Sequence, residues 1–131
     1  AHDSLWTLVE RTAGDPVARM ALVPRTMEAR GLDVTPPMQA RLPRAGDHAG
    51  VAVLDVILRD EVGHVALGNR WYHWLCARDG LEPEAHARAL AAQYRAPRPK
   101  GPFNLEARRR AGFGDAELKA LLDSQGPRKA S

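Results

Sequence analysis

Apolar residues recur at steps of three and four along most of this chain, which is the period of a helix that buries one face. The longest such run predicts a helix from about residue 48 to 78, with Asp47 as its N-cap and its end near Asp79 and Gly80. At ~1.5 Å per residue this helix is roughly 45 Å long, a length that is typical of helical bundles. The pattern therefore favours an all-α fold.

A second helical pattern occupies residues 3 to 30. It is interrupted at residues 14–16, it is bent at Pro24, which has no backbone N–H, and it is expected to end at Gly31. The next residues, 32 to 46, form a connector that contains a short helix. Because this connector can reverse the chain, the two long helices are predicted to pack antiparallel.

Shorter elements complete the chain. They are a helix over residues 83–94, an extended proline-rich segment over 95–103, a helix from the cap Asn104 to Arg110, and a last helix that begins at Asp115. We therefore predict one all-α domain over residues 1–125, built as a partial bundle of two long antiparallel helices with short C-terminal helices. Residues 126–131 are predicted to be a disordered tail.

Two chemically active side chains interrupt the apolar stripe of the longest helix. Glu61 and His64 are three residues apart, so they share one helix face. The rest of that face is apolar and consists of Leu54, Ile57, Gly68, Trp71 and Leu75. A carboxylate and an imidazole in an apolar stripe are costly unless a partner compensates them. A metal ion is such a partner, and Glu-x-x-His in a helical bundle is the ligand unit of di-iron and di-manganese carboxylate proteins.

The first helical pattern contributes a second carboxylate, Glu28. It lies near the end of the first helical pattern, so antiparallel packing of the two long helices can bring it to Glu61 and His64. Iron accepts carboxylate oxygen and imidazole nitrogen as ligands. We therefore predict an iron or manganese site with Glu28, Glu61 and His64 as its ligands.

The same residues have a second interpretation. Glu61 and His64 can form a buried hydrogen-bonded pair, joined by Arg25 or Arg30, without any metal. The residue pattern alone supports the two interpretations about equally. The aromatic residues that follow are predicted to pack in the core and its grooves: Trp71, Tyr72 and Trp74.

Composition narrows the choice of partners. The chain has 131 residues, a formal charge of +3 and acidic residues nearly as numerous as basic ones, so nucleic acid is an unfavoured partner. No apolar run of about 18 residues predicts a membrane span. The only cysteine, Cys76, permits no internal disulfide and fits a reducing compartment, so we expect a cytoplasmic protein.

Three separated segments resemble the signatures of one protein family. They are residues 19–36 (RMALVPRTMEARGLDVTP), residues 60–71 (DEVGHVALGNRW), and the late set KGPFN at 100–104, AR at 107–108 and AGF at 111–113. The family is an uncharacterised bacterial ferritin-like family, catalogued as a domain of unknown function. The resemblance extends from His2 to about Glu117, and it is specific because the three motifs occur in order.

The resemblance implies a ferritin-like helical bundle in which Glu28 is the bundle carboxylate and Glu61 and His64 form the Glu-x-x-His unit. Ferritin-like sites take a Glu and a Glu-x-x-His from each of two helix pairs, whereas this chain holds one pair. The chain therefore looks like the C-terminal half of the family's domain, and its first residue, Ala1, fits a piece of a longer protein. Either a missing N-terminal half or a second copy in a two-fold homodimer would complete the site.

Two functions follow from these observations. The first is a carboxylate-bridged di-metal protein, with iron as the expected metal, of oxidoreductase type and with a small-molecule substrate that the sequence does not identify. The second is a non-enzymatic helical interaction or scaffold domain in which Glu28, Glu61 and His64 form a buried polar network. The first requires a bound metal, whereas the second predicts full stability in the presence of a chelator.

Overall fold

The structure is a computed structural model that describes residues 2–43 and 46–125. All regular structure within these residues is helical, so the all-α prediction is confirmed for this part of the chain. The elements are α1 (His2–Arg11), α2 (Pro16–Leu22), η1 (Val23–Glu28), α3 (Ala29–Arg41), α4 (His48–Asp79), α5 (Pro83–Gln93), α6 (Leu105–Arg110) and α7 (Asp115–Asp123). The tail predicted at residues 126–131 lies outside the described residues. Among the residues described, we find no helix with the length and apolar character needed to cross a membrane.

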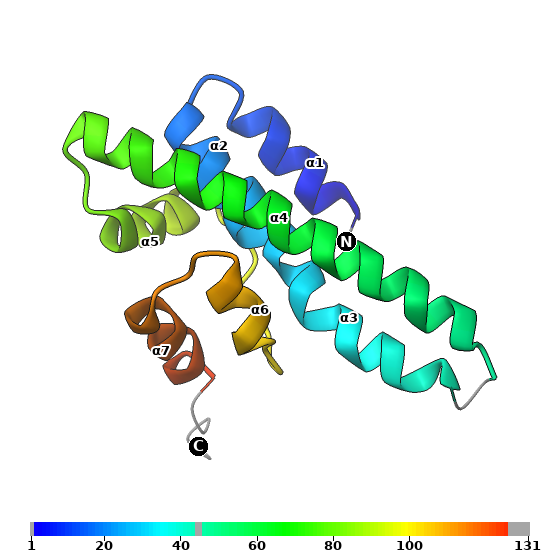
Figure 1. Ribbon diagram of the computed structural model, residues 1–131. Coiled ribbons are helices and arrows are strands. Elements are labelled where there is room, and N and C mark those ends of the chain that lie inside the picture. The colour runs from blue at the N-terminus through cyan, green and yellow to red at the C-terminus, as the bar shows by residue number, and fades with distance from the viewer. Residues whose placement is uncertain (1, 44–45, 126–131) are drawn as a thin grey trace, which may run out of the picture.

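Helix α4 is the element against which the others are arranged. The elements α2, η1 and α3 follow one another as a bent rod that runs antiparallel to α4, as the sequence predicted (Figure 1). Helix α1 lies along one side of this pair, and α5, α6 and α7 lie on the other side (Figure 1). The rod and α4 together form the framework that carries the candidate site.

Local signals define both ends of α4. The Asp47 side chain accepts a hydrogen bond from the backbone N–H of Gly50 at 2.8 Å, which satisfies one of the free donors of the first turn. Gly80 adopts the left-handed conformation (φ +68°), and Leu81 N–H donates to the Cys76 carbonyl at 2.8 Å. The predicted helix, 48 to 78, therefore differs from the observed one by a single residue.

The first long pattern does not end at Gly31, which is a correction to the sequence analysis. Helix α3 continues through Gly31 to Arg41 and includes Pro36 and Pro37, each of which removes one backbone hydrogen bond. Packing on α4 holds this part of the helix: beyond the two prolines, the Gln39 side chain donates to the Val51 carbonyl and to Asp55. Tertiary contacts have here outweighed local propensity.

A π-helical turn, η1, joins α2 to α3. Pro24 lies at its start and cannot donate a backbone hydrogen bond, so the regular ladder is interrupted there. The Thr26 hydroxyl donates to the Ala21 carbonyl at 2.8 Å within this turn. On the facing helix, a Cβ added at Gly68 would lie 2.5 Å from Pro24 Cγ, so Gly68 allows α4 to approach the proline closely.

The core consists of two apolar clusters that follow each other along α4. The first joins α1, α2, α5 and the C-terminal part of α4: Leu8, Val17, Ala18, Ala21, Leu22, Tyr72, Leu75, Cys76 and Leu90. The second joins α3, the middle of α4, α6 and α7 through Ala29, Leu32, Val65, Ala107, Ala111, Phe113 and Leu118. Tyr72 is buried as predicted, but Trp71 and Trp74 are 52% and 55% exposed, so their predicted core packing is wrong.

Candidate metal centre

The three predicted ligands line one hollow between the rod and α4. The hollow has a volume of about 320 Å³, and its lining residues are Met27, Glu28, Gly31, Glu61 and His64. Glu28 is the last residue of η1, whereas Glu61 and His64 are contributed by α4. Antiparallel packing therefore brings Glu28 to the Glu-x-x-His unit, as the sequence analysis expected.

The hollow lies nearer the surface than the sequence analysis expected. Glu28 and His64 are exposed, and Glu61 is half-buried. Neighbouring apolar positions on this side of α4 are also exposed, at 41% for Ile57 and 52% for Trp71. The predicted stripe is only partly covered because the described helices pack mainly on the other faces of α4.

Glu61 is the least satisfied polar side chain of the hollow. Its Oε2 atom is buried and has no hydrogen-bond partner among the described residues. Burial raises the pKa of Glu61 above its usual value, the nearby carboxylate of Glu28 raises it further, and His64 acts in the opposite direction. The environment thus disfavours the ionised form of Glu61 unless a cation stands beside it.

The three side chains do not form a finished metal site. Within the described part of the chain, no group of three or more His, Cys, Asp or Glu side chains is close enough to hold a metal ion. The hollow nevertheless brings together two carboxylates and one imidazole, a donor set that suits iron or manganese. Glu28 and His64 are both exposed, whereas Glu61 is partly buried.

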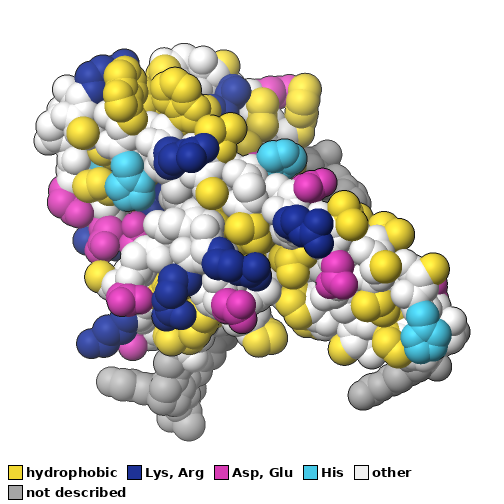
Figure 2. Space-filling view, viewed as in Figure 1, with side chains coloured by type: hydrophobic (Ala, Val, Ile, Leu, Met, Phe, Trp, Pro, Cys, Tyr) yellow, Lys and Arg dark blue, Asp and Glu magenta, His cyan; other side chains and the backbone are white. Residues whose placement is uncertain are grey.

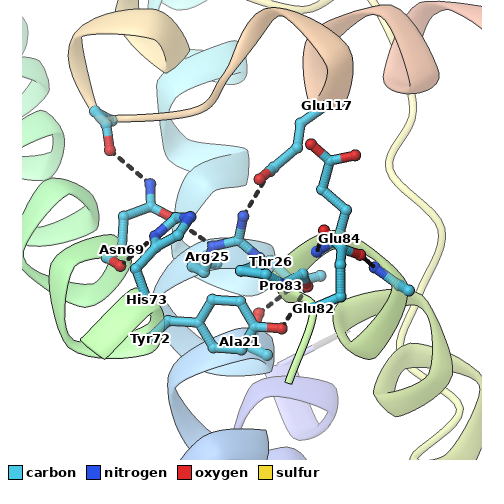
Figure 3. A network of polar contacts seen from close by, with 12 residues as sticks. Ala21, Arg25, Thr26, Asn69, Tyr72, His73, Glu82, Pro83, Glu84 and Glu117 are labelled. Atoms are coloured by element: carbon cyan, nitrogen blue, oxygen red, sulfur yellow. Dashed lines mark hydrogen bonds and ion pairs between the residues drawn. The ribbon is translucent and has the colours of Figure 1, made fainter. Parts of the chain in front are cut away.

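Arg25 does not join Glu61 to His64, although the second interpretation of the sequence included such a link. Its Nε donates to Asn69 Oδ1, and its Nη2 donates to Glu117 Oε2 at 2.5 Å (Figure 3). The guanidinium carbon lies 4.5 Å from the centre of the Tyr72 ring. Arg25 is thus directed away from the hollow and into the interior.

Asn69 continues this network. Its Nδ2 donates to the Ala111 carbonyl at 2.5 Å, so one buried side chain connects α4 to Arg25 and to the end of α6 (Figure 3). Nearby, the Tyr72 hydroxyl donates to the Pro83 carbonyl at 2.6 Å. The network lies between the two apolar clusters, because Asn69 falls between Val65 and Tyr72 on α4.

A second buried ion pair holds α6 on α3. Arg108 donates to both carboxylate oxygens of Asp33, from Nε at 3.0 Å and from Nη2 at 2.6 Å. The two side chains are 5% and 7% exposed. Asp33 also accepts the backbone N–H of Asn104 at 2.9 Å. This bidentate geometry, with a further donor on the carboxylate, compensates the burial of both charges.

The sequence analysis missed this set of buried contacts, made up of the Arg25 network and the Asp33–Arg108 pair, although most of its residues stand in the three quoted motifs. Arg25 and Asp33 belong to the first motif, Asn69 to the second, and Asn104 and Arg108 to the third. The signal that could have revealed it was the set of polar residues in these motifs that the metal site does not use. Its contacts fasten the C-terminal helices to the framework that carries the hollow.

Comparison with known proteins identifies a longer relative. Over 123 residues the chain is 48% identical to a protein of Haemophilus influenzae that is described only as an uncharacterized protein. The match covers 94% of this chain and 43% of the relative, so the chain spans less than half of that protein's length. No solved structure matches the chain.

The family is identified by a match that covers most of the chain. The expected resemblance to a family catalogued as a domain of unknown function is thereby confirmed, while the ferritin-like affiliation stays a prediction. On the basis of this match over residues 1–119, the chain belongs to the family described as "Protein of unknown function (DUF455)".

Proposed function

We propose that this chain contributes half of a ferritin-like, carboxylate-bridged di-metal site to a protein of oxidoreductase type. Glu28, Glu61 and His64 are the proposed ligands. The observation that carries the proposal is the buried, unpartnered Oε2 of Glu61 in a hollow that also contains a second carboxylate and an imidazole. A cation there would satisfy the orphaned oxygen and offset the repulsion between Glu28 and Glu61.

Each ligand has a role that follows from its position. Glu61 would bind as the ionised carboxylate at the wall of the hollow, and the exposed Glu28 would swing toward the same ion or bridge to a second one. His64 would bind as a terminal ligand through one nitrogen of its neutral imidazole. Bound iron at such a site would supply the redox chemistry of a reaction with dioxygen or peroxide.

The other half of the site would come from a second helix pair. Ferritin-like sites use two such pairs, and the longer relative has more than half of its length outside the match. Several apolar residues on α4 are at least 41% exposed, and hydrophobic side chains are visible on the surface toward both ends of α4 (Figure 2). They are Val53, Val56, Ile57, Leu67, Trp71 and Trp74. A second helix pair, from a longer chain or from a second copy, would cover this face.

Metal binding by ligand variants tests the proposal. We expect Glu61→Ala and His64→Ala each to abolish binding of Fe(II), measured as metal content after anaerobic loading and desalting. His48→Ala is the matched control, because His48 is an exposed histidine at the first turn of the same helix and should leave metal content unchanged. Unchanged metal content in both ligand variants would refute the assignment.

The exposed apolar face also supports the second candidate, a helical interaction domain without metal. Under that function, assembly would depend on the apolar face alone, and a chelator would change neither assembly nor thermal stability. Under the metal function, removal of the metal lowers stability, because the ion binds only the folded chain. Thermal unfolding with and without chelator therefore separates the two.

A further inference from the structure

Gly31 lies directly opposite the Glu61 carboxylate. A Cβ added at this position would stand 2.7 Å from both Cδ and Oε1 of Glu61, and closer still to Oε2. These separations are well below van der Waals contact, so the carboxylate occupies the space that any other side chain at position 31 would fill. Gly31 thus forms a notch in α3 that accommodates the end of Glu61.

Backbone conformation does not explain why a glycine stands at position 31. Positive φ among the described glycines occurs only at Gly46, Gly80 and Gly112, and Gly31 lies inside α3. A glycine inside a helix costs about 1 kcal/mol relative to alanine. The close approach of Glu61 is the contact that a larger residue would prevent.

The buried oxygen of Glu61 meets the backbone of α3 and no polar group of the described residues. This atom, Oε2, has no hydrogen-bond partner among the described residues, so no polar contact to it fixes the carboxylate. The backbone of α3 at Gly31 therefore limits where the buried oxygen can lie in the hollow that Glu28 and His64 also line.

We propose that Gly31 is a positioning residue for the metal site, a role that rests on the proposed function. By leaving the notch open, it lets Glu61 lie flat against α3 and present its carboxylate to the space shared with Glu28 and His64. A methyl group at position 31 would push the flexible end of Glu61 out of the notch, because that end moves more easily than the two packed helices. The hollow would still contain the ligand atoms of Glu28, Glu61 and His64, but these atoms would no longer be positioned around one metal ion.

The first experiment compares Gly31→Ala with Gly63→Ala. Gly63 is the matched control because a Cβ added there meets no atom within 4 Å, and it lies on the same helix as Glu61. Co(II) is the probe, and its visible absorption reports both affinity and ligand geometry. We expect Gly31→Ala to weaken Co(II) binding by on the order of 10–100-fold and to alter the spectrum, as loss of a supporting contact does at other metal sites. Equal affinity and an identical spectrum in Gly31→Ala and the parent chain would overturn the proposal.

The second experiment needs no metal, so it separates failure of this inference from failure of the metal function. Thermal midpoints are measured in chelator for the parent chain, Gly31→Ala, Glu61→Ala and the double variant. We expect Gly31→Ala to raise the midpoint when Glu61 is absent and to lower it, or raise it less, when Glu61 is present. The same shift in both backgrounds would show that the notch does not hold Glu61. In another outcome, the parent chain binds no Co(II) while Gly31→Ala still shifts the midpoint differently with and without Glu61. That result would refute the metal function but support the contact between Gly31 and Glu61.

Discussion

The chain holds two polar clusters on the same framework, the bent rod and α4, and the clusters differ in how completely their side chains are paired. Arg25 on η1 and Asn69 on α4 belong to a network that is joined to Glu117, and Asp33 on α3 is joined bidentately to Arg108. Less than one turn beyond Arg25, Glu28 faces the hollow that contains Glu61, whose buried Oε2 has no partner among the described residues. We call the first set the closed cluster, because its buried charges are paired within the chain. We call Glu28, Glu61 and His64 the open cluster, because a buried oxygen in it has no partner among the described residues.

The difference indicates what each cluster is for. Buried charges that find partners within the chain contribute to holding helices together, because removal of either partner leaves a charge without compensation. A buried carboxylate oxygen without a partner costs stability, and a bound cation is one way to offset that cost. The closed cluster is therefore structural, whereas the open cluster is the one on which the proposed metal site rests.

The largest effect is expected from breaking the closed cluster at Arg108. Arg108→Ala leaves the buried Asp33 carboxylate without its bidentate partner and should destabilise the chain by about 3–5 kcal/mol. Urea unfolding followed by circular dichroism measures this loss. Arg109→Ala is the control, because the neighbouring Arg109 makes an exposed ion pair with Asp115 at 3.4 Å that should be worth less than about 1 kcal/mol. Equal losses in both variants would contradict the structural role.

A smaller loss is expected from Asn69→Ala. The change leaves Arg25 Nε and the Ala111 carbonyl without their partner, and one such unsatisfied buried group costs about 1–3 kcal/mol. The same unfolding assay applies. Ser124→Ala removes an exposed hydrogen bond from the Ser124 hydroxyl to the Leu121 carbonyl and serves as the control with a smaller loss. An Asn69→Ala variant as stable as the parent chain would show that Asn69 does not link Arg25 to the end of α6.

In the open cluster, when no metal is present, a substitution of Glu61 is expected to raise stability rather than lower it. The folded pKa of Glu61 lies above its unfolded value, so the native state binds this proton more tightly. The resulting stability is present below the unfolded pKa and is lost as the pH rises through the folded pKa. Glu61→Gln removes this loss, so its stability relative to the parent chain should increase with pH across that window and then level off.

Unfolding in chelator at a series of pH values measures the effect of Glu61→Gln. The expected gain is smaller than the loss in either closed-cluster variant, because Glu61 is only half-buried. A difference between the variant and the parent chain that is independent of pH would show that Glu61 is not disfavoured as an anion.

The smallest effect on stability is expected at the exposed apolar face. Trp71→Gln should lower the free energy of unfolding of a single chain by only about 1 kcal/mol, because Trp71 is 52% exposed and its ring packs edge-to-face on the exposed Trp74. The same change should weaken self-association, measured as the concentration dependence of mass in light scattering. A large loss of stability without any change in association would place Trp71 in the core of the chain rather than at an interface.

Local signals explain which parts of the fold could be predicted. The ends of α4 depend on Asp47 and Gly80, which act on backbone groups within their own turn, so sequence alone was sufficient to place them. The course of α3 through Pro36 and Pro37 was not predicted, because its support comes from contacts with α4. Gly31 indicated the end of one helix and the prolines the start of a separate short one, and the tertiary contacts that support a single helix are absent from any short window of sequence.

The same distinction applies to the two polar clusters. Glu61 and His64 could be paired from their spacing alone, and antiparallel packing was enough to add Glu28. Arg25 and Glu117 are 92 residues apart, and no local pattern tells that their side chains meet. The exposure of Trp71 was also missed, because helical periodicity identifies an apolar face without showing what covers it.

The most direct test of the account is the iron content of anaerobically loaded protein, with the mass of the same chromatographic peak determined by light scattering. The account predicts about one iron per chain, in an assembly whose second helix pair completes the site, and loss of that iron in Glu61→Ala but not in Arg109→Ala. Protein that stays free of iron under these conditions, or that retains it in Glu61→Ala, would contradict the claim that the open cluster is a metal site.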